Sequence, residues 1–295
     1  LEPVNDQTSN LFISTVNIEE NGQGDLNNSP YVLPPGVIRD FDNTAQVTRQ
    51  LNEQSLQVCV DDLRNDRARA VFRNVTFDFL NYKRLRMYVH AHSPDQSARD
   101  GEMAAFIRLG TDFEENYYEI SIPLEITEPG VESPDGIWPL SNQFDVLFDD
   151  LTRAKALRRE RNGLSPNPDT DINYYEYQNG KYTIAVKGNP DLSNVLTVML
   201  GVRNLFLDGE QLGEQKSACL WFNELRVAEF DKNAGWAATA RVNSRLADFA
   251  TVTTSGRYIT EGFGAIGDKI SERSRSTQEQ FDIQSNINVD KFIPE

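Results

Sequence analysis

The sequence predicts a mainly β protein, in which a jelly-roll β-sandwich with one helix is followed by antiparallel strands that match the wall of a transmembrane β-barrel. Three observations support this fold class. Strand-like segments recur between residues 55 and 227 at the spacing typical of two packed sheets. One interruption has apolar residues at helical spacing instead. After residue 235, three segments return to the two-residue period of strands.

The composition restricts the class of partner. The chain has 295 residues, which is enough for one large domain or two ordinary ones with a substantial core. Its 45 acidic and 29 basic side chains give a formal net charge of -16. Such a surface repels phosphate backbones and anionic lipid headgroups, so we expect no nucleic-acid partner.

Targeting segments are not recognisable in the sequence. It begins with Leu1, and no basic stretch followed by an apolar one marks a signal peptide, so we expect a mature product or an excised fragment. No apolar run reaches the roughly 18 residues that a transmembrane helix needs, although the strands of a barrel would escape that criterion.

Residues 1–54 are predicted to form an extended N-terminal connector laid over a neighbouring domain. Turn-forming Asn, Gly and Pro residues are frequent here, and only residues 11–18 have the pattern of a strand. Pro34, Pro35 and Gly36 impose an extended approach followed by a turn.

Residues 55–230 are predicted to form the jelly-roll sandwich. About eight segments alternate between apolar and polar residues, which is enough for two packed antiparallel sheets. The clearest alternation covers residues 84–92, where Leu85, Met87 and Val89 share one face. The other segments are residues 56–60, 71–79, 103–109, 118–122, 182–186, 195–204 and 218–227.

One helix, at about residues 141–160, is predicted to interrupt these strands. Ser141 or Asn142 can cap it. Apolar residues then recur at helical spacing, at Phe144, Leu147, Phe148, Leu151 and Ala154. Basic residues occupy its last turns, which suits the negative end of the helix dipole, and we interpret them as a solvated helix end: Lys155, Arg158, Arg159 and Arg161.

Residues 231–295 contain the segments with barrel-like alternation. The predicted lipid-facing side chains are Trp236, Ala238, Ala240, Val242, Phe281, Ile283, Ile287 and Val289. Periodicity alone favours an ordinary soluble antiparallel sheet with one wet face, because the barrel signal of each segment is weak. Three strands cannot close a barrel, so the barrel interpretation requires the chain to be part of something larger.

The two cysteines, Cys59 and Cys219, lie in strand-like runs near the two ends of the sandwich region. If those strands are neighbours, the pair can form a disulfide in an exported protein; the alternative is two buried free thiols. A zinc site would need more ligands than these cysteines and the distant His90 and His92 supply.

No motif for catalysis is complete, so we expect the chain not to be an enzyme. His90 and His92 share the polar face of one strand and lack a nucleophilic serine partner, so we interpret them as surface histidines. Adjacent acids such as Glu114 and Glu115 are not placed across a cleft, as a glycosidase requires. A Gly-x-Gly-x-x-Gly pattern starts at Gly262, but it lies between barrel-like strands rather than in a βαβ unit, and we interpret it as a turn.

No cofactor is expected either. Asp169, Asp171 and Asn173 match the first ligand positions of an EF-hand loop, but the later ligands are missing. The sequence is therefore compatible only with a looser structural calcium site. A group of aromatic side chains could form a sugar-stacking or peptide-binding platform, although such residues more often cover a neighbouring sheet: Tyr88, Phe106, Tyr117, Tyr174, Tyr175 and Tyr177.

Several motifs in fixed order carry a resemblance to one family. The sequence Trp-Phe-Asn-Glu-Leu-Arg at residues 221–226 leads into Gly-Trp-Ala-Ala at residues 235–238 and the run at residues 241–249. Further motifs lie at residues 31–36, 52–56, 108–112, 116–119 and 273–276. From about Tyr31 to the C-terminus the chain resembles the SprA/Sov family, the outer-membrane translocon of the type IX secretion system in Bacteroidota, associated in some members with gliding motility.

The resemblance implies a very large outer-membrane barrel with soluble insertions. The sandwich would be an insertion resembling galactose-binding-like modules, and the chain from Gly235 onward would be barrel wall. The implied partners are secreted cargo proteins, plug proteins, other type IX components and outer-membrane lipid, and the family supplies no catalytic residue.

The alternative is a secreted carbohydrate-binding surface module with the same jelly roll, and an acid–base hydrolase is a remote third class. Residues 231–295 discriminate between the translocon and the carbohydrate-binding module, because a secreted binding module does not need lipid-facing strands.

Overall fold

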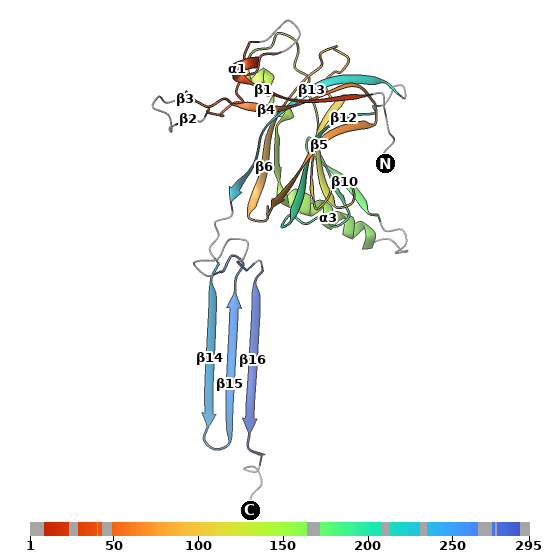
Figure 1. The fold of residues 1–295 in the computed structure, drawn as a ribbon. Coiled ribbons are helices and arrows are strands. Elements are labelled where there is room, and N and C mark those ends of the chain that lie inside the picture. Colours follow the sequence, from red (N-terminus) through yellow and green to blue (C-terminus); the bar gives the residue numbers. More distant parts are fainter. Residues whose placement is uncertain are drawn as a thin grey trace, which may run out of the picture. The chain divides into compact units, whose positions relative to one another are not determined.

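The chain is described by a computed structural model that covers residues 9–23, 29–39, 41–42, 49–163, 172–207, 213–230, 235–264, 273–274 and 276–289. It divides into two compact units, Leu1–Phe230 and Asp231–Glu295 (Figure 1). Strands dominate both units, and every strand pairing is antiparallel. The prediction of a mainly β protein is therefore confirmed.

Two antiparallel sheets form the body of the first unit. A five-stranded sheet has the order β1 (Asn10–Asn17), β4 (Gln54–Arg64), β13 (Gln215–Phe230), β6 (Tyr82–His92), β9 (Phe144–Leu147). A six-stranded sheet has the order β10 (Tyr174–Asn179), β11 (Tyr182–Lys187), β8 (Tyr117–Pro123), β7 (Met103–Gly110), β12 (Val195–Asn204), β5 (Arg67–Phe77). A short pair, β2 (Phe41–Asp42) and β3 (Arg49–Gln50), stands apart from both.

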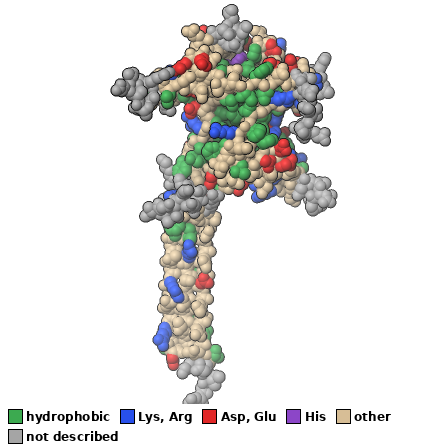
Figure 2. Space-filling view, viewed as in Figure 1, with side chains coloured by type: hydrophobic (Ala, Val, Ile, Leu, Met, Phe, Trp, Pro, Cys, Tyr) green, Lys and Arg blue, Asp and Glu red, His purple; other side chains and the backbone are tan. Residues whose placement is uncertain are grey.

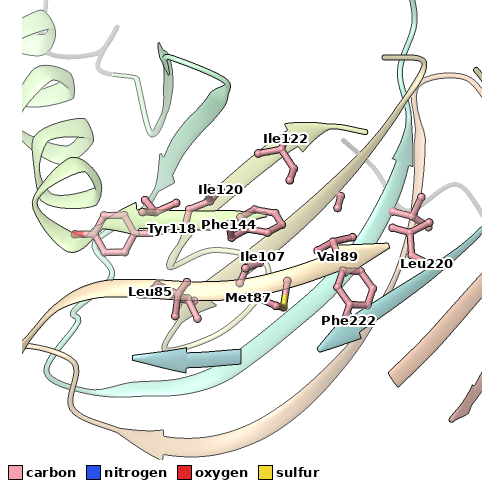
Figure 3. Packing of buried hydrophobic residues seen from close by; sticks show 14 of the residues in the cluster. Leu85, Met87, Val89, Ile107, Tyr118, Ile120, Ile122, Phe144, Leu220 and Phe222 are labelled. Carbon is pink, nitrogen blue, oxygen red and sulfur yellow. The ribbon is translucent and has the colours of Figure 1, made fainter. Parts of the chain in front are cut away.

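The hydrophobic core lies between these two sheets. Leu85, Met87 and Val89 point inward from β6, and Ile107 and Ile120 point inward from β7 and β8 (Figure 3). All are buried, because residues two apart on a strand share one face. Burying each such side chain stabilises the fold by about 1.5–3 kcal/mol.

Three short helical segments and one long helix accompany the sheets. The short ones are α1 (Ile18–Asn21), α2 (Pro134–Ile137) and the 3₁₀ turn η1 (Leu140–Asn142), and the long one is α3 (Phe148–Gly163). Among the described residues, no helix combines the length and apolar character that a bilayer crossing requires.

The helix predicted at about residues 141–160 starts later than expected. Phe144–Leu147 forms strand β9, which pairs with β6 so that Val146 lies opposite Leu85. Phe144 and Val146 are buried, whereas Asp145 and Leu147 are half-buried, which is a two-residue period. Over four residues this period cannot be distinguished from helical spacing. The predicted helix therefore included the residues of β9 together with those of α3.

The N-terminal region also differs from the prediction. The strand expected at residues 11–18 is present as β1, but it pairs with β4 along its whole length. Farther along, Tyr31 is buried between Trp138 and Trp221, and the Trp138 indole donates a hydrogen bond of 2.8 Å to the Val32 carbonyl. The extended connector predicted for residues 1–54 is therefore corrected: these parts of it belong to the first unit.

The second unit is a three-stranded meander. It consists of β14 (Ala237–Leu246), β15 (Ala250–Ile259) and β16 (Gln278–Ile287), in that order across the sheet. A tight turn joins β14 to β15, with Ala247 in the left-handed region at a φ of 48°. Within the described residues the sheet is open and does not close on itself.

Candidate functional site

The register of β14, β15 and β16 places side chains of all three strands in rows across the sheet. Directly opposed residues of antiparallel strands point to the same side. Three rows on one side are Ala240–Gly256–Phe281, Val242–Thr254–Ile283 and Leu246–Ala250–Ile287, and the row Ser244–Val252–Ser285 lies between the last two. One face of the sheet is therefore formed mainly by apolar and small residues, and its polar interruptions are Thr254, one Ser–Val–Ser row and Glu279, which lies in the row Ala238–Tyr258–Glu279.

The predicted lipid-facing residues meet on this face, which we call the apolar face. Ala238, Ala240 and Val242 reach it from β14, and Phe281, Ile283 and Ile287 reach it from β16. Trp236 precedes β14, and its ring lies 5.1 Å from that of Tyr258, the residue opposite Ala238. Val289 lies beyond the end of β16, where the strand register no longer places it on either face.

The large side chains of the apolar face are exposed. Their exposed fractions range from 49% for Ile287 to 68% for Phe281. Soluble monomers rarely expose contiguous apolar patches of this kind without a partner surface. Within the described part of the chain, these side chains are not covered.

The opposite face of the same sheet is polar. Its rows include Arg241–Ser255–Asp282, Asn243–Thr253–Gln284 and Arg245–Thr251–Asn286. Figure 2 shows basic side chains spaced along this unit among mostly polar surface. The sheet is therefore amphipathic across all three strands.

The central strand explains why the pattern is weak in the sequence. Apart from Tyr258 near its end, β15 contributes small or medium-sized residues to the apolar face, and a Cβ atom added to Gly256 would lie 3.9 Å from Cδ2 of Phe281. Large side chains on β14 and β16 flank these small ones. The alternation of β15 alone is therefore poor, although its position in the sheet is unambiguous.

The two cysteines lie on neighbouring strands of the first unit. Cys59 on β4 is directly opposite Cys219 on β13, and a disulfide joins them across a sequence separation of 160 residues. The bond links β4 to β13, the last strand of the first unit.

The interpretation of His90 and His92 as surface residues is wrong. Both are buried on the face of β6 that points away from the main core, and His90 lies 4.0 Å from the Trp221 ring. Nδ1 of His90 donates to the Ile137 carbonyl at 2.8 Å, which leaves its Nε2 to accept from Nδ1 of His92 at 2.9 Å. Both rings are neutral in this arrangement.

The surroundings of these histidines also oppose protonation. Burial lowers the pKa of His90 to about 3, with the neighbouring His92 adding to the effect. Burial lowers the pKa of His92 to about 4. The sequence reasoning missed this because the cover comes from distant segments, around Tyr31 and Trp138.

The aromatic platform considered for sugar stacking is not assembled. Phe106 and Tyr117 are buried, while Tyr175 and Tyr177 pack against the core. Tyr117 instead lies under the Arg108 guanidinium, 4.2 Å from it. This leaves no row of exposed rings among those residues.

A buried ion-pair network lies beside that tyrosine. The Glu119 carboxylate accepts from Nε of Arg108 at 2.6 Å and from Nη2 of Arg203 at 2.9 Å. The carboxylate is almost fully buried, whereas the two arginines are partly exposed. Its hydrogen bonds are satisfied, so the network is a structural feature of the six-stranded sheet.

The calcium prediction falls mostly outside the described residues, where Asp169 and Asp171 lie. Asn173 is described, and its backbone carbonyl accepts from Arg158 at 2.7 Å. In the described ranges, no group of three or more His, Cys, Asp or Glu side chains is placed to hold a metal ion. Gly262 has a φ of 81°, which agrees with a turn at the start of the glycine pattern, whose last glycine, Gly267, lies outside the described residues.

Comparison with known families decides the identity of the chain. The SprA_N family model, described as motility related/secretion protein, matches residues 1–295. The chain belongs to this family. No curated protein matches the sequence. Membership of the SprA family gives the chain a general role in secretion or motility and indicates a location in the cell envelope or at the cell surface.

Proposed function

We propose that the chain is part of a giant outer-membrane β-barrel translocon, which passes folded cargo proteins across the outer membrane in type IX secretion and serves gliding motility. In this proposal β14, β15 and β16 are three strands of the barrel wall. The chain has no catalytic role and acts by shaping the pore and binding its partners.

The amphipathic register of these three strands carries the proposal. Each strand has 10 residues, and a strand that crosses a bilayer at a tilt needs about 9–11. Strands of such a wall alternate between an apolar side toward lipid and a polar side toward the lumen. The apolar face would contact lipid, and the polar face with Arg241, Arg245 and Asp282 would line a water-filled lumen.

The open edges of the sheet support the same role. A membrane-spanning sheet must pair every backbone amide and carbonyl, so it has to close into a ring. Three strands cannot do this, and further strands of the complete wall would pair with β14 and β16.

In this proposal the first unit is a jelly-roll insertion outside the bilayer. The disulfide between Cys59 and Cys219 supports an exported location, because such bonds persist in oxidising compartments. The partners would be secreted cargo, plug proteins and other type IX components. The carbohydrate-binding alternative has lost its main support, since Phe106 and Tyr117 are buried.

Separate expression of the two units tests the proposal. Residues 1–230 contain the disulfide and both large sheets, and we predict a folded protein that is soluble without detergent. Residues 235–295 carry the apolar face, and we predict that they stay in solution only with detergent or lipid. A soluble, monomeric second fragment in plain buffer would argue for a secreted binding module instead.

A further inference from the structure

A cavity of about 280 Å³ lies against α3 in the first unit. Its walls include Leu80, from the turn between β5 and β6, and Leu192, from the turn before β12. Tyr118 also lines it: the ring is part of the core, and its oxygen points away from the core toward the helix (Figure 3). Burial raises the pKa of Tyr118 to about 12, so the hydroxyl stays protonated.

Two cations from α3 line the same cavity. Lys155 and Arg159 are one helical turn apart, and Nζ of Lys155 donates to the Pro190 carbonyl at 3.1 Å. That bond leaves two further N–H groups on the ammonium. Burial lowers the pKa of Lys155, and the neighbouring Arg159 and Arg158 lower it further.

The interpretation of the basic residues of α3 as a solvated helix end is wrong for Arg158, whereas Arg159 and Arg161 are exposed. Arg158 is buried and donates to the carbonyls of Asn173 and Gly188, at 2.7 and 2.5 Å. Among the described residues, one carboxylate lines the cavity: that of Asp191, which accepts from the Ser193 amide at 2.8 Å. Two lining cations face one lining carboxylate, in a chain whose formal net charge is -16.

An exposed large apolar side chain lines the cavity, and another lies on the stretch that leads to it. Leu80 is 49% exposed at the cavity, and Phe77 on the neighbouring stretch is 54% exposed. The backbone amide of Phe79, between them, donates to the Leu192 carbonyl at 2.8 Å, which ties this turn to the cavity wall. Phe77 also lies opposite Val195 in the sheet, next to the exposed Leu196.

We propose that this cavity binds an anionic amphiphile, whose carboxylate or phosphate contacts Lys155, Arg159 and the Tyr118 hydroxyl and whose short apolar chain covers Leu80 and Phe77. The cavity volume of about 280 Å³ is at the lower end of the range for small-molecule sites, which begins at about 300 Å³. The cavity therefore suits a small ligand with a head group and a few methylene groups. Charge-assisted hydrogen bonds from an ammonium and a guanidinium are the strong contacts for such a head group. The site lies in the first unit and does not depend on the translocon proposal.

Calorimetric titration of the full chain, held in solution by a nonionic amphipol, tests this inference with four probes. Hexyl phosphate and hexanoate carry both parts of the proposed ligand, inorganic phosphate carries only the charge, and hexanol carries only the chain. We expect hexyl phosphate or hexanoate to bind at least about tenfold more tightly than inorganic phosphate and hexanol, because the charged group and the apolar chain both contribute to the affinity. Preference for hexyl phosphate would indicate a lipid phosphate as the natural source, and preference for hexanoate a fatty acid.

Three variants sharpen the test. Arg159→Gln should weaken binding of the preferred probe about tenfold or more, since it removes a charged hydrogen bond. Asp191→Asn keeps the acceptor for Ser193 but removes the negative charge, so it should tighten binding. Arg161→Gln is the matched control, because Arg161 is exposed on the same helix and does not line the cavity.

The inference is overturned if neither amphiphile shows saturable binding. It is also overturned if inorganic phosphate binds as tightly as hexyl phosphate, or if Arg159→Gln and Arg161→Gln behave alike.

Discussion

Val242 and Ile283 both lie opposite Thr254, one on each side of it, although they belong to the first and last strands of the second unit. The row brings the alternation of β14 and the alternation of β16, which were predicted separately, to the same side of one sheet. It creates one apolar face three strands wide, backed by a polar face of the same width. A face of this kind requires an apolar environment, and we propose that lipid supplies it.

Charge placed on the apolar face should be costly, whereas the same charge one residue away should not. Val242→Arg would put a guanidinium near the middle of the wall, at a cost of about 2–4 kcal/mol. Asn243→Arg changes the polar face and is the matched control. We expect the first variant to reduce the amount of protein in the outer-membrane fraction and the second to leave it near the wild-type level. Equal levels of the two variants would contradict a lipid-facing role for Val242.

Sequence periodicity was sufficient for the outer strands of this sheet but not for its centre. Phe281 and Ile283 alternate with polar residues, so their common side could be predicted from β16 alone. Gly256 and Ala250 have no comparable signal, because their small size is useful only between large neighbours on β14 and β16. The cross-strand register determines which residues of β15 lie on the apolar face, and the sequence of one strand does not reveal that register.

Loss of the disulfide should destabilise the first unit. Replacing both cysteines, as Cys59→Ser with Cys219→Ser, removes a link that closes a very long loop, and the expected loss is about 2–5 kcal/mol. Urea unfolding of residues 1–230 measures it. A reducing agent should lower the midpoint of the wild-type protein and leave the double variant unchanged. A wild-type midpoint that does not respond to reduction would show that the bond contributes little.

Acid should destabilise the first unit through the buried histidines. The folded-state pKa values of His90 and His92 are about 3 and about 4, below the ordinary value of 6.5, so the unfolded chain binds protons first as the pH falls. Their contribution is fully present above pH 6.5 and is lost as the pH falls to about 4 for His92 and about 3 for His90. Between pH 6.5 and pH 5 each histidine should account for about 2 kcal/mol.

Thermal unfolding at pH 7, 6 and 5 measures this effect. His92→Gln should flatten the dependence, since one of the two titrating groups is removed. The pKa of Asp112 is lowered to about 2 by several hydrogen bonds that outweigh its burial, so that carboxylate loses its contribution only below its ordinary value of 3.8. An unfolding temperature that does not change from pH 7 to pH 5 would refute the neutral, buried histidine pair.

These histidines also mark a limit of sequence reasoning. Alternation along β6 correctly separated Leu85 and Met87 from His90 and His92. It could not reveal that Tyr31 and Trp138, from segments far away in the chain, cover the second side of that strand. A polar side of a strand was therefore mistaken for a solvent-facing one.

The Glu119 network should be far more sensitive to truncation than an exposed ion pair on the same sheet. Glu119→Ala removes the buried carboxylate between Arg108 and Arg203 and should cost about 3–5 kcal/mol. Glu115 pairs with Lys187, and the Glu115 side chain is 65% exposed. Glu115→Ala should therefore lower the free energy of unfolding by about 1 kcal/mol at most. Urea unfolding of both variants provides the comparison, and similar losses would mean that the Glu119 network is weakly coupled to the fold.

Spin-label accessibility along β14 and β16 tests the lipid-facing assignment most directly. Single cysteines at Val242, Asn243, Ile283 and Gln284 would carry the label in the complete protein in lipid bilayers, while Cys59 and Cys219 stay blocked in their disulfide. We predict that labels at Val242 and Ile283 collide mainly with oxygen, which concentrates in the bilayer, and that labels at Asn243 and Gln284 collide mainly with a water-soluble nickel chelate. The same response at all four positions, or the reverse pattern, would contradict the proposal that these strands form a membrane wall.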